Sequence, residues 1–284
     1  MLVAITRGVS DRLGACELTH LTRVPIDLML ARDQHRRYEE ALRRGGCQVV
    51  SLPPLHDLPD AVFVEDVAVV LDEIAVVTRP GAASRRPEAA SVAAALPAYR
   101  KVAQIEAPGT LDGGDVLRLG RRIYVGLSGR SNQAGIEHLR ALAEPYGYSV
   151  VGVTVSGCLH LKSAVTEVAP GTILINPAWV DPHTFGNVEI VKVDPDEPYG
   201  ANGLVLAESR DARQVPGVTV YPASFLRTRR ILEARGIELD IVDVSELQKA
   251  EGAVTCCSLI LSVDPAGTPG HRGGVASDQR MSYR

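Results

Sequence analysis

The sequence has no long hydrophobic run and no marked excess of charge of either sign. No apolar stretch among its 284 residues approaches the roughly 20 residues that a membrane-spanning helix needs. Residues 1–6 are too short for the apolar core of a secretory signal peptide, so we expect neither secretion nor membrane insertion. The 30 basic and 34 acidic residues leave a net charge of −4, which provides no attractive field for nucleic acid or for an anionic membrane. The expected partner is therefore a small, charged metabolite.

Cysteine and the common metal-binding and phosphate-binding motifs are also scarce. Five cysteines are too few, and odd in number, for a disulfide scaffold, which favours reduced thiols and a cytoplasmic location. The chain has neither a Cys-x-x-Cys pair nor a His-x-x-x-His pair. Gly113-Gly114 lacks the helix signals and the Lys-Ser/Thr of a phosphate-binding loop. We therefore expect no metal and no cofactor.

Composition indicates one globular domain followed by a tail. Hydrophobic residues make up 45% of the chain and charged residues 23%, as is usual for a soluble globular protein. After about Asp264 few residues are able to bury surface. We expect a single catalytic domain over residues 1–264 and a mobile tail over residues 265–284. The sequence leaves open whether the protein is a monomer or a homodimer.

Hydrophobic patterning predicts an order of strand, strand, helix, strand that recurs along the chain. One copy runs from the apolar stretch Ala61–Val70 through the strand Ile74–Thr78 and the helix Arg85–Leu96 to the strand Val102–Ile105. The helices Asn132–Tyr146 and Ala223–Arg235 belong to later copies. A remaining copy is divided between the two ends of the chain. It is complete if the strand that holds Cys256 pairs with Leu2–Ile5, and this closure removes free sheet edges.

Residues suited to thiol chemistry recur at a nearly constant step. Glu65, Asp112 and His160 follow one another at intervals of 47 and 48 residues, and Cys256 comes 96 residues later, which is two further steps. About five such steps fit in the chain. Five α/β units of the type ββαβ around an axis would bring these positions together at the centre, as radial repeats do.

The pair Cys256-Cys257 allows two interpretations. A free thiol is among the most buried side chains, so both residues could be small core residues. A cysteine with a histidine and carboxylates as partners could instead be a nucleophile. For Cys257 we keep the core interpretation, because alternation along a strand would turn its side chain to the opposite face.

Five segments, taken together, resemble the dimethylarginine dimethylaminohydrolases of the guanidino-group-modifying superfamily. They run in order across nearly the whole chain: Phe63-Val-Glu-Asp-Val-Ala-Val-Val70, Thr78-Arg-Pro-Gly81 with Ser84-Arg85-Arg86, Leu111-Asp-Gly-Gly-Asp-Val-Leu117, Cys158-Leu-His-Leu-Lys-Ser163 and Leu247–Ser258. The resemblance implies an α/β fold, a five-bladed α/β propeller (pentein-like). It also implies hydrolysis of Nω-methylated arginine to citrulline and a methylamine through a covalent cysteine intermediate, in a cysteine-dependent amidine hydrolase.

The resemblance also implies catalytic roles for three residues. Cys256 would attack the guanidinium carbon, and His160 would serve as general acid and then as general base. Asp112 would hold the imidazole in its productive tautomer, although an aspartate before two glycines is also a common turn residue. We expect Asp115 to be such a structural residue.

Seven further residues would bind the substrate. Asp60, Glu65 and Asp66 supply anions for a guanidinium, whose planar donors suit carboxylates. Two acids within an apolar run need a cationic partner, which is either the substrate or an internal arginine such as Arg79. By resemblance, the α-carboxylate binds Arg85 and Arg130. The α-ammonium binds backbone carbonyls that correspond to Leu18 and Ala250.

Two alternatives remain. Arginine deiminases share the scaffold and the thiol chemistry, but they carry an aspartate two residues after the catalytic histidine, where this chain has Lys162. This difference favours methylated substrates. The other alternative is a non-catalytic five-bladed binding module, which would have no need to keep Cys256, His160 and Asp112 together.

Overall fold

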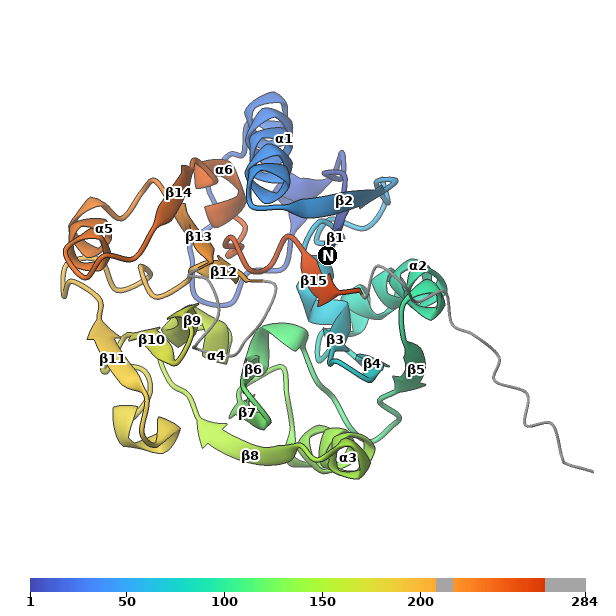
Figure 1. Ribbon diagram of the computed structural model, residues 1–284. Helices are drawn as coiled ribbons and strands as arrows, with labels where there is room; N and C mark the ends of the chain where they lie inside the picture. The colour runs from blue at the N-terminus through green and yellow to red at the C-terminus, as the bar shows by residue number, and fades with distance from the viewer. Residues whose placement is uncertain (208–216, 264–284) are drawn as a thin grey trace, which may run out of the picture.

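The computed structural model describes residues 1–207 and 217–263, and in these residues the strands form five separate sheets of three strands each (Figure 1). The predicted tail lies outside the described residues. The sheets contain, in turn, β15 (Leu259–Ser262), β1 (Leu2–Arg7) and β2 (Cys47–Leu52); β3 (Ala68–Val70), β4 (Ile74–Val77) and β5 (Lys101–Gln104); β6 (Val116–Leu119), β7 (Arg122–Leu127) and β8 (Ser149–Thr154); β9 (Val165–Ala169), β10 (Thr172–Ile175) and β11 (Glu189–Lys192); and β12 (Leu204–Leu206), β13 (Val218–Pro222) and β14 (Leu239–Val242).

Every sheet repeats one pairing pattern. Its first two strands are antiparallel and its last two are parallel, as β3, β4 and β5 show. A parallel pair needs a crossover, and helices provide it in four sheets: α1 (Leu28–Arg44), α2 (Ala89–Ala95), α3 (Gln133–Ala143) and α5 (Leu226–Glu233). Between β10 and β11 the described chain has only the short 3-10 helix Pro182–Phe185. Figure 1 shows the five sheets arranged in a ring with these helices at the rim. The predicted five-bladed α/β propeller is confirmed.

The two ends of the described chain close the ring. β15 pairs antiparallel with β1, with Leu2 opposite Ser262 and Ile5 opposite Leu259. This is the predicted closure, but Cys256 is not on the strand, which begins only at Leu259. Figure 1 shows β15 and β1 side by side near the N-terminus.

Helix α1 shows how local sequence determines an element. The Asp27 side chain accepts hydrogen bonds from the backbone N–H groups of Met29 and Leu30, which caps the first turn. Tyr38 and Leu42 are among the residues that the helix buries against β1 and the last blade. The helix ends at Gly45-Gly46, where Gly46 adopts a left-handed φ of 86°.

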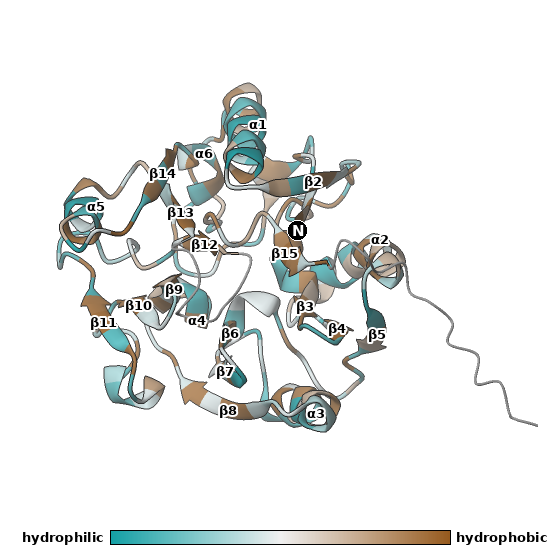
Figure 2. Cartoon of the chain, in the orientation of Figure 1, coloured by the Kyte–Doolittle hydropathy of each residue, from teal (hydrophilic) through white to brown (hydrophobic). Residues whose placement is uncertain are grey.

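Burial follows the blades. Figure 2 shows mainly hydrophobic colour on strands such as β14 and much hydrophilic colour on the rim helices α1 and α5. Within the described residues, every helix is too short or too polar to cross a bilayer.

Two further helices, α4 (Leu161–Ala164) and α6 (Ser245–Gln248), were not predicted, because a single helical turn is too short to show a periodicity.

Candidate active site

A small cavity lies where turns from several blades meet. Of the ten predicted site residues, seven line it: Cys256, His160, Asp60, Asp66, Arg85, Arg130 and Ala250. Asp112 lies behind His160, and Glu65 and Leu18 are not in the wall. Segments that are remote in the sequence therefore place a thiol, an imidazole, carboxylates and guanidinium groups around one small space.

Cys256 lies in a turn and not on the predicted strand. Its N–H donates to the Ala253 carbonyl at 3.2 Å, and the N–H of Ser258 donates to the Thr255 carbonyl at 3.4 Å. These i to i−3 bonds prevent extended pairing until Leu259. The Cys256 carbonyl accepts the N–H of Glu65 at 3.1 Å, which ties the turn to the carboxylate segment.

Cys257 is a core residue. Its side chain is fully buried, and its thiol lies 3.5 Å from the Ala253 carbonyl, within a cluster that includes Tyr38 and Val254. The predicted location holds, but the predicted reason was wrong, because the turn conformation and not strand alternation separates the two thiols.

His160 precedes helix α4 and is held by two carboxylates. Its Nε2 atom lies 3.1 Å from Asp112, and its Nδ1 atom lies 3.8 Å from Asp66. A Cβ atom on Gly114 would come within 2.5 Å of Nδ1, so only glycine leaves room for the ring. Asp115, buried as expected, accepts the N–H of Leu161 at 2.9 Å and so fixes the backbone that follows the histidine.

The carboxylates keep the imidazole charged. Burial alone would lower the pKa of His160, but Asp66 and the hydrogen bond to Asp112 outweigh it and raise the pKa to about 9. The pKa of Asp66 falls to about 2, because His160 and Arg85 more than offset the effect of its burial. The ring is therefore an imidazolium at neutral pH.

The thiol is held in its neutral form. Burial raises the pKa of Cys256 above the usual range for a thiol, and the negative charges of Glu65 and Asp66 raise it further. Lys162 acts in the opposite direction and is the weaker influence. Without an added positive charge, Cys256 is a thiol and not a thiolate.

Arg85 is the internal cation that pairs with Asp66, the second of the two adjacent acids. It is 3% exposed, and its Nη1 atom donates to Asp66 at 2.6 Å. Its Nη2 atom donates to Glu88 at 2.8 Å. Arg79, proposed from the sequence as the rival partner, instead donates to the Gly109 carbonyl at 3.2 Å.

One nitrogen of the Arg130 guanidinium makes no hydrogen bond to a described residue. Its Nη2 atom donates to Thr19 Oγ1 at 3.3 Å, and its Nη1 atom lies 3.7 Å from an oxygen of Asp112. That Nη1 atom is buried and makes no hydrogen bond to any described residue. A buried donor without an acceptor is costly and suits a bound anion.

The N-terminal loop and Ala250 complete the wall. The N–H of Glu17 donates to Asp60 at 3.1 Å, and Glu17 itself lines the cavity. Burial raises the pKa of Asp60, whereas Arg85 lowers it and does not fully offset the burial. Leu18 is half-buried against the core cluster that includes Ala250.

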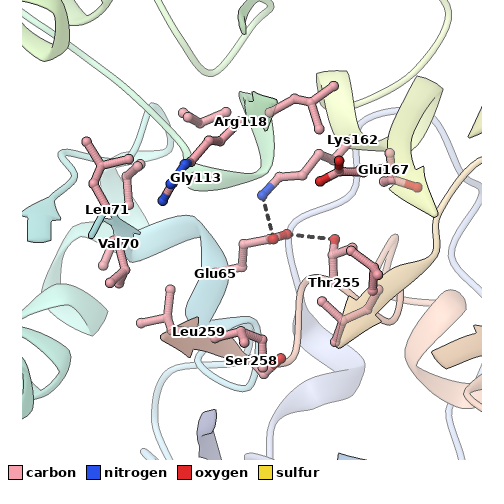
Figure 3. Close-up of a pocket in the computed structure, with 18 of the residues that line it drawn as sticks. Glu65, Val70, Leu71, Gly113, Arg118, Lys162, Glu167, Thr255, Ser258 and Leu259 are labelled. Carbon is pink, nitrogen blue, oxygen red and sulfur yellow. Dashed lines mark hydrogen bonds and ion pairs between the residues drawn. The ribbon is translucent and has the colours of Figure 1, made fainter. Parts of the chain in front are cut away.

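Glu65 faces a different space. Its carboxylate binds the ammonium group of Lys162 at 2.5 Å and accepts the hydroxyl of Thr255 at 2.8 Å (Figure 3). These three residues line a second pocket, and Glu65 and Lys162 are absent from the wall of the Cys256 cavity. The Glu65–Lys162 ion pair therefore lies next to the turn that carries Cys256, but outside the Cys256 cavity.

Among the residues that the structure describes, one group of side chains is close enough to hold a metal ion. The ligand atoms of Asp66, Asp112 and His160 lie within 4.8 Å of one another. A histidine must be neutral to bind a metal, and Asp66 is already paired with Arg85. The raised pKa of His160 therefore disfavours a metal here.

Comparisons with known proteins identify the family of the chain. The family model for eukaryotic N,N-dimethylarginine dimethylhydrolase matches residues 24–259. An N(G),N(G)-dimethylarginine dimethylaminohydrolase of Streptomyces coelicolor is 43% identical over 260 residues, which are 91% of this chain and 96% of the relative. The chain belongs to the dimethylarginine dimethylaminohydrolase family. The resemblance seen in the sequence is confirmed.

A further comparison is with the dimethylarginine dimethylaminohydrolase of Pseudomonas aeruginosa, in sequence and in structure. The Pseudomonas aeruginosa relative is 33% identical over 235 residues, covering 82% of this chain and 89% of the relative. A solved structure from the same organism, a cysteine-to-serine variant complexed with citrulline, superposes with a TM-score of 0.83 at 32% identity. The match covers 90% of this chain and 98% of that chain.

Sequence reasoning missed three acidic residues at the site of this dimethylarginine dimethylaminohydrolase family member. Glu88 supports Arg85, and its i, i+3 spacing from that arginine was a signal that could have been used. Glu17 and Glu251 line the cavity, but both lie in irregular segments where no spacing rule applies.

Proposed function

We propose that this chain hydrolyses Nω-methylated arginines, asymmetric dimethylarginine and monomethylarginine, to citrulline and dimethylamine or methylamine. The observation that carries the proposal is the cavity that brings Cys256 and His160 together with two acids and two arginines. Family membership supports the same activity. A binding module without catalysis would have no use for a thiol beside an imidazolium.

The two charged ends of the substrate match the two kinds of charge in the wall. Asp66 and Asp60 receive the substituted guanidinium through charge-assisted hydrogen bonds. Arg130 offers its Nη1, which makes no hydrogen bond to a described residue, to the α-carboxylate, and Arg85 provides a second positive charge nearby. The backbone carbonyls of Leu18 and Ala250 accept the α-ammonium.

Substrate binding also activates the nucleophile. The cationic guanidinium lies beside a thiol whose pKa is raised by burial and by carboxylates. The added positive charge lowers that pKa, so the thiol of Cys256 releases its proton to solvent and attacks the guanidinium carbon. A C–S bond forms as the carbon becomes tetrahedral.

His160 then performs both proton transfers. As an imidazolium it donates a proton to the departing dimethylamine, and the C–N bond breaks to leave a thiouronium intermediate. The neutral ring takes a proton from water, whose oxygen attacks the same carbon. The C–S bond breaks, the sulfur leaves as thiolate, the remaining hydroxyl proton is lost to solvent, and citrulline is released. Asp112 holds the ring through its 3.1 Å contact with Nε2 during both steps.

Arginine deimination is the second candidate, and Lys162 argues against it. The deiminase pattern requires a carboxylate at this position as a second contact to an unmethylated guanidinium. Here the side chain is an ammonium group that is bound to Glu65 outside the Cys256 cavity. The cavity thus has no second pair of acceptors from this position.

A direct assay tests the proposal. Purified protein is incubated with asymmetric dimethylarginine, monomethylarginine and arginine in parallel, and citrulline is measured by its colour reaction. We expect citrulline from the methylated substrates and much less from arginine. A folded protein that produces no citrulline from any of them would contradict the proposal, and a preference for arginine would favour the deiminase.

A further inference from the structure

The side chain of Glu251 is bound to the N-terminal loop. Its carboxylate accepts the backbone N–H groups of Thr19, His20 and Leu21 at 3.0, 2.5 and 2.6 Å. One carboxylate therefore receives three successive N–H groups of a segment more than 200 residues away in the sequence. Hydrogen bonds to an ionised group are stronger than those between neutral groups.

This segment, called loop 17–21 from here on, forms part of the catalytic cavity. Glu17 lines the cavity and donates its N–H to Asp60. Thr19 accepts a hydrogen bond from Arg130. The conformation of loop 17–21 therefore sets the position of two residues that we assign to substrate binding.

Packing alone does not hold loop 17–21 in place. Glu17, Thr19 and His20 are exposed, and Leu18 and Leu21 are only half-buried. His20 and Leu21 line a third pocket, so on this side they face open space and not a filled core. Polar contacts are then the main restraint, and Glu251 provides three of them.

The backbone of Glu251 is unusual. It is the one described residue other than glycine with a positive φ, at 58°. This left-handed conformation is strained for a residue with a Cβ atom and is usual for glycine or asparagine. The N–H of Glu251 donates to the Gln248 carbonyl and that of Gly252 to the Leu247 carbonyl, which hold the turn. A strained glutamate whose carboxylate is fully engaged indicates that the side chain has a role.

We propose that Glu251 is a positioning residue that keeps loop 17–21 closed on the substrate. By fixing three N–H groups of loop 17–21, Glu251 orients the Leu18 carbonyl of the same loop toward the α-ammonium. The neighbouring Ala250 carbonyl is placed by the same turn. The proposal rests on the proposed function for its kinetic consequence, but the closure of loop 17–21 can be measured without substrate.

Hydrogen exchange tests the first part of the proposal, that Glu251 holds loop 17–21 in place. Glu251→Gly removes the carboxylate and is compatible with the left-handed backbone. We expect amide exchange in a peptide spanning residues 17–23 to accelerate about ten-fold or more, because three charge-assisted bonds are lost. Glu251→Gln keeps one carbonyl acceptor and should show an intermediate rate. Unchanged exchange in both variants would overturn the proposal.

Glu197 provides the matched control. Its carboxylate also accepts two backbone N–H groups, those of Arg227 and Thr228 at 2.9 and 2.7 Å, at the start of helix α5. Glu197→Ala should accelerate exchange around residues 227–228 and leave residues 17–23 as in the unaltered protein. If Glu197→Ala accelerates residues 17–23 equally, general loosening and not the Glu251 contact explains the effect.

Kinetic measurements test the second part of the proposal, that the position of loop 17–21 serves substrate binding. With asymmetric dimethylarginine, Glu251→Gly should raise KM about ten-fold, while kcat falls less, because the carboxylate contacts the loop and not the reacting carbon. Partial recovery of KM in Glu251→Gln supports positioning. An unchanged KM with accelerated exchange would overturn the claim that closure serves binding. If the unaltered protein produces no citrulline, the proposed function fails, whereas the exchange result still decides whether Glu251 holds the loop.

Discussion

The Nε2 atom of His160 lies 3.1 Å from Asp112, while the opposite ring nitrogen lies 3.8 Å from Asp66. The imidazole is thus placed between two carboxylates, and the second of these is shared with Arg85. Because of this arrangement, the protonation state of the His160 ring affects the free energy of unfolding of the protein.

The first prediction concerns stability between pH 7 and 9. His160 in the folded protein has a pKa of about 9, above its ordinary value of 6.5. The folded state therefore keeps a proton that the unfolded state releases, and stability is lost as the pH rises through this window. We expect the free energy of unfolding to fall by about 2 kcal/mol between pH 7 and 9. Denaturant unfolding of the protein and of His160→Gln at both pH values measures the difference, which the variant should lack. If the free energy of unfolding changed equally with pH in both proteins, the prediction would be contradicted.

The second prediction separates the two adjacent thiols. Cys256→Ser should reduce turnover at least about a thousand-fold, because a hydroxyl is a far weaker nucleophile under these conditions. Cys257→Ser buries a hydroxyl in the core, costs about 1 kcal/mol of stability and keeps most activity. Citrulline release and thermal unfolding of both variants are measured together. Equal loss of activity would indicate packing and not nucleophilic attack.

The third prediction tests the contact to the α-carboxylate. Arg130→Ala should raise KM for a methylated arginine about 10- to 100-fold, as expected for a lost charge-assisted hydrogen bond. KM for an N-methylated alkylguanidine without a carboxylate should change far less. Arg36→Ala, in an exposed ion pair with Glu40 on helix α1, serves as control. A similar loss for both substrates would show that Arg130 acts on the guanidinium end.

Arg85 is a less suitable probe of the same contact. Its removal would leave Glu88 buried without a cation and Asp66 with only His160 as a cationic neighbour. Breaking a buried ion pair in this way costs about 3–5 kcal/mol. A loss of activity in Arg85→Ala would therefore combine folding with binding, and stability has to be measured beside it.

The repeated blades could be predicted from the sequence because their cause is local. Alternating and apolar runs predict strands, Asp27 and Gly46 delimit a helix, and a constant step indicates a radial repeat. Closure through β1 and β15 followed from the need to cover sheet edges. Short helical turns such as α4 carry no periodicity and were therefore missed.

The site residues were harder to place, because side-chain direction depends on tertiary contacts. Cys256 was expected on a strand, since its neighbours are apolar, yet i to i−3 bonds keep it in a turn. Glu65 and Asp66 are adjacent in the sequence, but their carboxylates turn toward Lys162 and Arg85 respectively. No pattern in one sequence reveals which partner each acid meets.

The fourth prediction follows from the direction of Lys162. If residue 162 faced the substrate, Lys162→Asp would supply the deiminase carboxylate and raise activity on arginine. The Lys162 side chain instead contacts Glu65, whose pKa is already raised by burial even with this cation beside it. Lys162→Asp therefore places a second carboxylate beside a buried acid and should destabilise the fold by about 3 kcal/mol or more, without a gain in arginine turnover. Lys162→Met removes the charge without adding another and should cost less. Thermal unfolding and citrulline release from arginine are measured for both variants. A rise in arginine turnover in Lys162→Asp would show that the side chain at position 162 reaches the guanidinium.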